Sequence, residues 1–238
     1  MSNFFRNLGR KTGAKIHKAK WYYDSLAGEE NDSINAEFEM GAFLARDHRS
    51  QMQVLQNERV RTTCAALANR LANENWCITP TVLDNQCSEA FALPGGFIFI
   101  TNTLVNFCDD DDRLAFVLAH EIGHVIKRHA IRRVAASQAA GFFNQALASR
   151  TPATRMLTPF VGQLVQNGYT EEQEFDADDF ACRLTKSAGY HPAAGIQWMR
   201  ELLDVTDELP IISTHFAAHP PLKQRIARMQ KAQTSTPE

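Results

Sequence analysis

Residues 114–126 read Leu-Ala-Phe-Val-Leu-Ala-His-Glu-Ile-Gly-His-Val-Ile and contain the motif H-E-x-x-H at His120, Glu121 and His124. The apolar residues on both sides of the motif predict a helix, and residues four apart share one face of a helix. The two histidines can therefore reach one metal ion, and two imidazoles favour zinc. Glu121 lies beside them and can act on a metal-bound water.

The residues around the motif predict one helix from Asp110 to Arg133. Carboxylates complement a helix N-terminus, and Asp109–Asp112 open the segment. Cations complement the C-terminus, and the segment closes with Lys127, Arg128, Arg132 and Arg133. Gly123 costs about 1 kcal/mol against alanine inside a helix, so we expect another element to pack closely on its face. The plain alternative is a buried helix with two incidental histidines.

A zinc site needs a third protein ligand, which this helix does not supply. An H-E-x-x-H-x-x-G-x-x-H pattern would need histidine at 130, where the chain has Ala130. His129 is one residue out of register and is expected to point elsewhere on the helix. The acidic stretch 171–179 offers carboxylates instead, and Glu174 and Asp178 in it share a helix face. Glu174 is a candidate ligand and Asp178 a candidate acceptor for a ligand histidine; taken alone, the stretch would be a solvated acidic face.

Four stretches, in this order, resemble the HtpX-like zinc metalloendopeptidases, the family that includes the prenyl-protein (CAAX) proteases. They are residues 91–101 (FALPGGFIFIT), His120–His124, Glu174–Asp178, and His219-Pro220 with Arg225. The resemblance implies a gluzincin, in which two histidines and one glutamate bind a single zinc ion. Carried over onto this sequence, the zinc ligands are His120, His124 and Glu174, the general base is Glu121, and the residues that support the ligands are Asp178 and Arg225.

Two departures from the family pattern concern substrate binding and catalysis. Family members hold substrate on a strand that matches Ala90, Phe91 and Ala92, but Glu89 replaces the usual asparagine before it. The backbone of the strand can still form hydrogen bonds. Near the C-terminus, the family's Ser-Thr-His-Pro is interrupted, as if four residues were inserted.

The interruption leaves two candidates for the family's histidine, which steadies the transition state or binds the zinc as a fourth ligand. His219 keeps the family's spacing to Arg225 and is the preferred catalytic candidate, whereas His215 is its rival. An ordinary loop histidine is an equal alternative for both. In the transition state, the oxyanion would be stabilised by zinc, together with His219 or Arg225.

The expected function is that of a zinc-dependent endopeptidase that hydrolyses peptide bonds in protein substrates, with protein quality control as a candidate role. The alternative is a catalytically silent or self-inhibited zinc protein that acts as a chaperone or scaffold, which a zinc-bound His219 would favour. The complete ligand set and the intact Glu121 argue against that alternative. Peptide deformylation is a weaker option, because its usual ligand set includes cysteine. No cysteine lies near enough to either motif in the sequence to suggest such a ligand.

The expected fold is α+β and predominantly helical, with a zincin-like small three-stranded antiparallel or mixed sheet packed on the active-site helix. A long helix is expected from Ser33 to about Asn73. Expected strands are 76–83, with Pro80 indicating an edge, 89–93 and 97–101, and expected later helices are 170–187, 192–206 and 221–231. Residues 134–168 are expected to wall or cover the site. The expected organisation is a basic extension (1–30), a protease domain (31–231) and a polar tail (232–238).

Composition and charge narrow the class of protein. The chain has 238 residues, 44% of them hydrophobic and 22% charged, as in ordinary globular proteins. A net charge of −2 gives no general attraction to nucleic acid, so the expected partner is a protein or peptide substrate. Five cysteines without a C-x-x-C pair indicate free thiols and a cytoplasmic location. The sequence predicts no transmembrane helix and no secretory signal.

Residues 1–20 differ from the rest of the chain in their charge. They carry six basic residues and no acidic ones, together with apolar residues such as Phe4, Phe5 and Leu8. This combination makes the segment a candidate for peripheral contact with an anionic membrane or with a partner. A transit peptide, or a solvated arm that packs loosely on the acidic remainder, are the alternatives.

Overall fold

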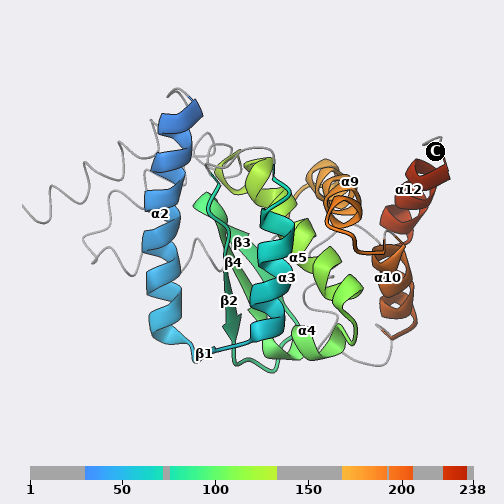
Figure 1. Ribbon diagram of the computed structural model, residues 1–238, viewed down its shortest axis with the longest axis horizontal. Coiled ribbons are helices and arrows are strands. Elements are labelled where there is room, and N and C mark those ends of the chain that lie inside the picture. Colours follow the sequence, from blue (N-terminus) through green and yellow to red (C-terminus); the bar gives the residue numbers. More distant parts are fainter. Residues whose placement is uncertain (1–29, 72–75, 133–167, 192, 206–221, 235–238) are drawn as a thin grey trace, which may run out of the picture.

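The structure is a computed structural model that describes residues 30–71, 76–132, 168–191, 193–205 and 222–234 (Figure 1). The helices are α2 (Glu30–Gln51), α3 (Glu58–Ala68), α4 (Asn102–Phe107), α5 (Asp111–Ile126), α9 (Glu171–Ser187), α10 (Ala194–Val205) and α12 (Leu222–Thr234). The strands are β1 (Val54–Leu55), β2 (Thr79–Leu83), β3 (Ala90–Leu93) and β4 (Phe97–Thr101). Within these ranges, no helix has the length and apolarity needed to cross a membrane.

Several predicted features lie outside the described residues. They are the basic segment 1–20, residues 134–167 of the predicted wall, and both His215 and His219. The predicted domain boundaries stay predictions, although α12 continues to Thr234, past the predicted start of the tail. All five cysteines lie in described parts of the chain and are free thiols, as predicted.

The predominantly helical class with a small mixed sheet is confirmed, but the sheet has four strands rather than three. Its order is β1-β2-β4-β3, with β2 and β4 parallel and the other two pairs antiparallel. The additional strand, β1, falls inside the long helix predicted from Ser33. That helix is divided because Asn57 caps a new helix, α3, by accepting a hydrogen bond from the Val60 backbone at 3.1 Å. Strand β2, predicted at an edge, lies inside the sheet.

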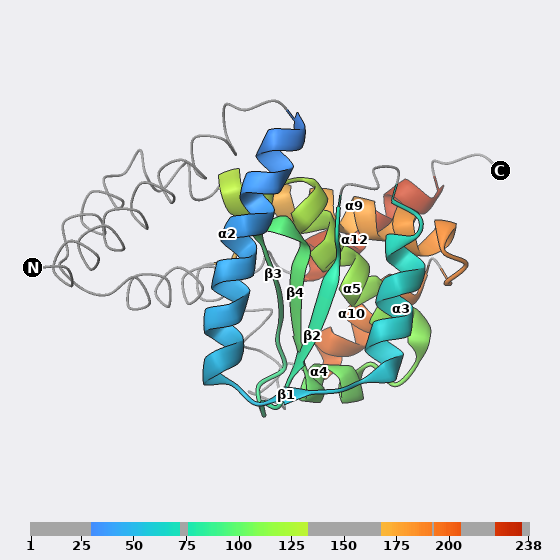
Figure 2. The same cartoon turned by 60° about the vertical axis from the view of Figure 1, so that its left-hand side comes forward.

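The sheet is buried between α2 on one face and α5 on the other (Figures 1 and 2). Successive side chains of a strand point to opposite faces, so β4 contributes to both layers. Phe97 and Phe99 pack with Leu44 of α2, whereas Ile98 and Ile100 join the core around α5. This explains why the strand is apolar throughout rather than alternating.

A tight turn joins β3 to β4 and lies against α2. It consists of the 3₁₀ turn η1 (Pro94–Gly96), in which Gly95 and Gly96 have φ values of 78° and 96° that favour glycine. Helix α2 contacts this turn through Gly41, where an added Cβ would lie 1.7 Å from the Pro94 carbonyl oxygen. The end of the β3–β4 hairpin is thereby fixed to α2.

Helix α5 passes through the interior, and its residues from Leu114 to Val125 are all buried. Asp110 caps it by accepting a hydrogen bond from the Arg113 backbone at 2.7 Å, in agreement with the predicted start. The predicted end at Arg133 is wrong, because α5 ends at Ile126 and the chain turns at Arg128, whose φ is 57°. Helical conformation resumes at residue 129. Helix α9 packs on α5, and α12 packs on α9 (Figure 1).

We expect Gly41→Ala to lower the free energy of unfolding by about 2 kcal/mol or more, since the methyl group would overlap the backbone of the turn. Helix propensity alone would favour alanine by about 1 kcal/mol, so the sign of the effect tests the close contact. Urea denaturation measures it. Asn35→Ala, at an exposed position of the same helix, is the control and should have little effect. A Gly41→Ala protein as stable as the wild type would contradict the contact.

Candidate metal centre

Helices α5 and α9 approach each other closely at Gly123. A Cβ on this residue would lie 3.2 Å from the Cα and from the carbonyl oxygen of Ala177. The expectation that another element packs on the Gly123 face is therefore confirmed, and that element is α9. Helix α9 begins with a capping box in which Thr170 and Gln173 exchange side-chain and backbone hydrogen bonds. The cap fixes the start of the helix one turn before Glu174.

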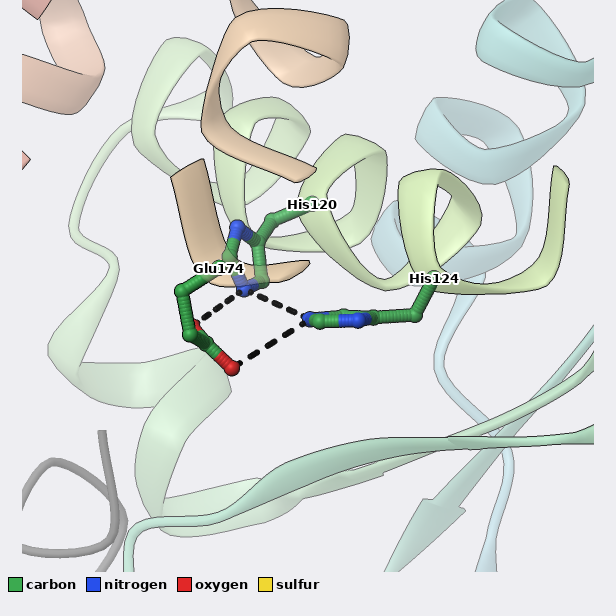
Figure 3. Close-up of side chains that lie close together, drawn as sticks. All are labelled: His120, His124 and Glu174. Atoms are coloured by element: carbon green, nitrogen blue, oxygen red, sulfur yellow. Dashed lines mark hydrogen bonds and ion pairs between the residues drawn. The ribbon is translucent and has the colours of Figure 1, made fainter. Parts of the chain in front are cut away.

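The three predicted metal ligands meet between these helices, and all three side chains are buried (Figure 3). The Nε2 atoms of His120 and His124 are 3.1 Å apart. The Glu174 carboxylate lies 3.4 Å from Nε2 of His120 and 3.6 Å from Nε2 of His124. Tetrahedral zinc with ligands at about 2.0–2.1 Å separates them by about 3.3 Å. The donor set and its spacing therefore suit a metal ion such as zinc.

Asp178 and Arg225 contact the candidate ligands, Asp178 at His120 and Arg225 at Glu174. Asp178 accepts from Nδ1 of His120 at 3.0 Å, one helical turn after Glu174. Arg225 of α12 donates to both Asp178 oxygens, at 2.6 and 2.7 Å, and its Nη1 is 3.5 Å from Glu174. Burial opposes the charged form of Asp178, but the adjacent Arg225 outweighs it and holds the pKa of Asp178 below its usual range. Arg225 is thus directed at the two carboxylates.

The described residues of the site carry more negative than positive charge. Three buried carboxylates, Glu121, Glu174 and Asp178, surround one buried guanidinium, Arg225. Such an excess is costly in a site with little water. Burial lowers the pKa of His120, yet hydrogen bonds to Asp178 and Glu174 outweigh it and raise the pKa to about 9. With His120 neutral, as a metal ligand must be, three ionised carboxylates and one guanidinium leave an excess of about two negative charges, which a divalent cation would balance.

Glu121 connects the three candidate ligands to strand β3. Its carboxylate is buried and accepts a hydrogen bond from the backbone of Ala92. Burial raises the pKa of Glu121 to about 7, although His120 and the Ala92 hydrogen bond oppose the shift. A pKa raised towards neutrality suits a group that takes up and releases a proton.

The predicted substrate strand forms one edge of the sheet beside this carboxylate. The side chains of Ala90 and Ala92 face the core around α5, whereas Phe91 faces α2 and stacks on Phe99 at 5.1 Å between ring centroids. No described strand pairs with the outer edge of β3. Glu89, which replaces the family's asparagine, is half-buried, and burial raises its pKa.

Two residues at the site were not predicted. His129 was expected to point away, but its Nδ1 lies 2.9 Å from Nδ1 of His124, and the side chain is fully buried. Tyr169 stacks on the His124 ring, with ring centroids 3.8 Å apart and planes inclined by 16°. The prediction for His129 was wrong because it assumed one straight helix through Arg128, where the chain turns. Tyr169 directly precedes Thr170, the cap of α9. Its position at the start of the helix that carries Glu174 was the one sequence feature that could have indicated a place at the site.

The chain is similar to known proteins over most of its length. The model of peptidase family M48 matches residues 39–233. The β-barrel assembly-enhancing protease of Yersinia pestis is 29% identical over 187 residues, which cover 72% of this chain and 38% of that protein. The mitochondrial metalloendopeptidase OMA1 of Schizosaccharomyces pombe is 29% identical over 155 residues, 63% of this chain and 45% of that protein. The chain thus spans less than half the length of these curated relatives.

A solved structure also matches the chain, at lower sequence identity. The crystal structure of S. mikatae Ste24p has a TM-score of 0.48 and 19% identity, and the match covers 94% of this chain and 64% of that one. The range matched by the family model contains the six predicted residues that meet at the site, which are His120, Glu121, His124, Glu174, Asp178 and Arg225. The resemblance found in the sequence is confirmed: the chain belongs to peptidase family M48.

Proposed function

We propose that the protein is a zinc-dependent endopeptidase whose zinc is held by His120, His124 and Glu174. The observation that carries this proposal is the convergence of three buried donor atoms, 3.1–3.6 Å apart, next to the Glu121 carboxylate. Zinc bound there would lower the pKa of a water molecule towards neutrality and polarise a peptide carbonyl. The names of the two relatives, a protease and a metalloendopeptidase, support the same chemistry.

Glu121 acts as the general base and then as the general acid. Its carboxylate takes the proton of the attacking water and passes it to the leaving amine of the cleaved peptide. Burial and the raised pKa suit both steps, because the group can hold a proton near neutral pH and release it again. The hydrogen bond from Ala92 orients the carboxylate and couples it to the strand that receives the substrate.

Strand β3 binds the substrate as an added strand. An extended peptide beside Ala90–Leu93 would form backbone hydrogen bonds with the outer edge of the sheet. Backbone pairing places the scissile peptide next to Glu121 and gives little sequence selectivity by itself. The substrates are therefore proteins or peptides with an accessible extended segment.

Arg225 and Asp178 position the ligands rather than the reacting atoms. Arg225 is 2% exposed and is held by Asp178 and Glu174, so its guanidinium supports the ligands from behind. Stabilisation of the transition state then falls to His219, as the sequence predicted, with His215 as its rival. Both histidines lie outside the described residues. The self-inhibited alternative, which depends on His219 binding the zinc, therefore stays a prediction.

The biological setting remains a proposal. A role in protein quality control is supported by the relative whose name connects it with β-barrel assembly. The cytoplasmic location was predicted from the free cysteines, whereas the name of another relative places that protein in mitochondria. Peripheral contact with a membrane or a partner through residues 1–20 stays a prediction.

We expect Glu121→Gln to lower kcat for an internally quenched peptide by at least ~100-fold, since it removes the general base. The zinc content should stay at the wild-type level, because Glu121 is not a ligand. Glu172→Gln, at an exposed position of α9, is the matched control and should leave kcat unchanged. Cleavage by Glu121→Gln at the wild-type rate would refute the proposed mechanism.

We expect kcat/KM to fall as the pH decreases, with an apparent pKa no higher than about 7. Glu121 accepts a proton only in its ionised form, and burial raises its pKa to about 7. A bound cation would lower that value. The measurement is a pH profile from 5 to 9, with zinc content determined at each pH because protonation of His120 competes with metal binding. Activity that rises steadily from pH 7 to pH 5 would contradict the assignment.

We expect Arg225→Met to lower the free energy of unfolding of the metal-free protein by about 3–5 kcal/mol, as when one partner of a buried ion pair is removed. Asp178 and Glu174 would then be buried without their guanidinium. Arg228→Met is the control on the same helix, where Arg228 pairs with Asp179 near the surface and contributes less than about 1 kcal/mol. Equal effects of the two substitutions in urea denaturation would show that the buried contacts do not support the site.

A further inference from the structure

The two histidines of the H-E-x-x-H motif have different partners at the nitrogen that faces away from the ligand cluster. Nδ1 of His120 lies 3.0 Å from a carboxylate oxygen of Asp178. Nδ1 of His124 lies 2.9 Å from Nδ1 of His129, which is a neutral acceptor when that nitrogen carries no proton. A histidine that binds a metal through Nε2 carries its remaining proton on Nδ1, and the acceptor of that proton fixes the ring.

We infer that His129 is a positioning residue that accepts the Nδ1–H of His124 and so directs Nε2 of His124 towards Glu174. This inference rests on the proposed function, because it takes His120, His124 and Glu174 to hold a metal ion. It concerns a residue that the motif does not contain. On a straight helix, a residue five positions after His124 would lie about 140° round the axis and could not reach its ring.

The backbone turn at Arg128 brings His129 back to His124. Arg128 has a φ of 57°, a conformation that residues other than glycine adopt uncommonly. Its guanidinium pairs with Glu37 of α2, a side chain that is 1% exposed, and this pair ties the turn to the helix on the other side of the sheet. The turn interrupts the helix, and helical conformation resumes at His129 with its ring against His124.

The His124 ring is also fixed on one of its faces. Tyr169 stacks on it at 3.8 Å, and the Tyr169 ring lies 5.9 Å from that of His129. Contact at Nδ1 sets the tautomer and the rotation of the ring, whereas contact on the face sets its plane. A neutral acceptor also suits this position, because the site already contains three buried carboxylates and one guanidinium among the described residues.

The test compares two substitutions of His129 that differ in hydrogen bonding. Leucine removes the acceptor, whereas asparagine places an acceptor oxygen at the δ position where histidine has Nδ1. We expect His129→Leu to weaken zinc binding by ~10- to 100-fold and to change the visible spectrum of the cobalt(II) form. His129→Asn should restore the affinity to within a few-fold of the wild type. Competition with a chromogenic chelator measures the affinity of the full chain for zinc.

His48→Leu is the control for replacing a histidine away from the site. His48 is half-buried, lies edge-on to both Phe91 and Phe99, and belongs to the α2 face of the sheet. Its zinc affinity should equal that of the wild type. The inference is overturned if His129→Leu binds zinc like the wild type with an unchanged cobalt(II) spectrum. It is also overturned if His129→Asn is as weak as His129→Leu while both melt at the wild-type temperature, since only packing would then matter.

A measurement on the wild type decides the matter if His129→Leu does not fold. In ¹⁵N NMR of the zinc-loaded protein, we expect a proton on Nδ1 of His124 and none on Nδ1 of His129. A proton on Nδ1 of His129 would overturn the inference. Failure of the proposed function looks different: the wild type itself would then bind no zinc, or His120→Ala would bind it as tightly as the wild type.

Discussion

The close approach of α5 and α9 at Gly123 and Ala177 is the contact on which the rest of the site depends. With glycine at this point, the backbones lie so near that a single methyl group would crowd Ala177. The candidate ligands and Asp178 are arranged around the contact in the same way on both helices. His120 and His124 stand three residues before and one after Gly123, and Glu174 and Asp178 stand three before and one after Ala177. Residues at these spacings share a helix face, so one contact gathers all four groups.

Gathering these groups brings three buried carboxylates together, and their negative charge must be balanced. Arg225, from a helix far along the chain, neutralises part of the excess through both oxygens of Asp178 and through Glu174. Against burial, hydrogen bonds to Asp178 and Glu174 raise the pKa of His120, whereas burial itself raises the pKa of Glu121. A divalent metal bound by His120 would compete with the proton on that ring, since a ligand histidine must be neutral.

The sheet connects the site to the opposite side of the molecule. On its α5 face, the backbone of Ala92 donates a hydrogen bond to Glu121. Its other face is covered by α2 (Figure 2). Through the ion pair of Glu37 with Arg128, α2 also contacts the turn that follows α5. Helix α2 further fixes the β3–β4 turn through Gly41. The edge strand and the end of the motif helix are thus held by the same element, which keeps the two sides of the proposed substrate site in register.

The sequence by itself determined the parts of the protein that depend on neighbours a few residues away. The four-residue spacings of His120 with His124 and of Glu174 with Asp178 were sufficient to predict which side chains share a helix face, because helical periodicity is local. The caps of α5 and α9 and the close packing at Gly123 were predictable for the same reason. The order of the four motif stretches then indicated the family.

Only the tertiary structure decided what depends on contacts between distant residues. The strand Val54–Leu55 pairs with Leu83 and Val82, nearly thirty residues away, so its sequence alone resembled the surrounding helices. The left-handed turn at Arg128 is stabilised by Glu37, 91 residues earlier, and no local sequence pattern predicted the turn. That turn places His129 against His124, while Arg225 reaches Asp178 across 47 residues. Local propensity fixes the candidate ligands, and the long-range packing of charged and apolar groups fixes which residues support them.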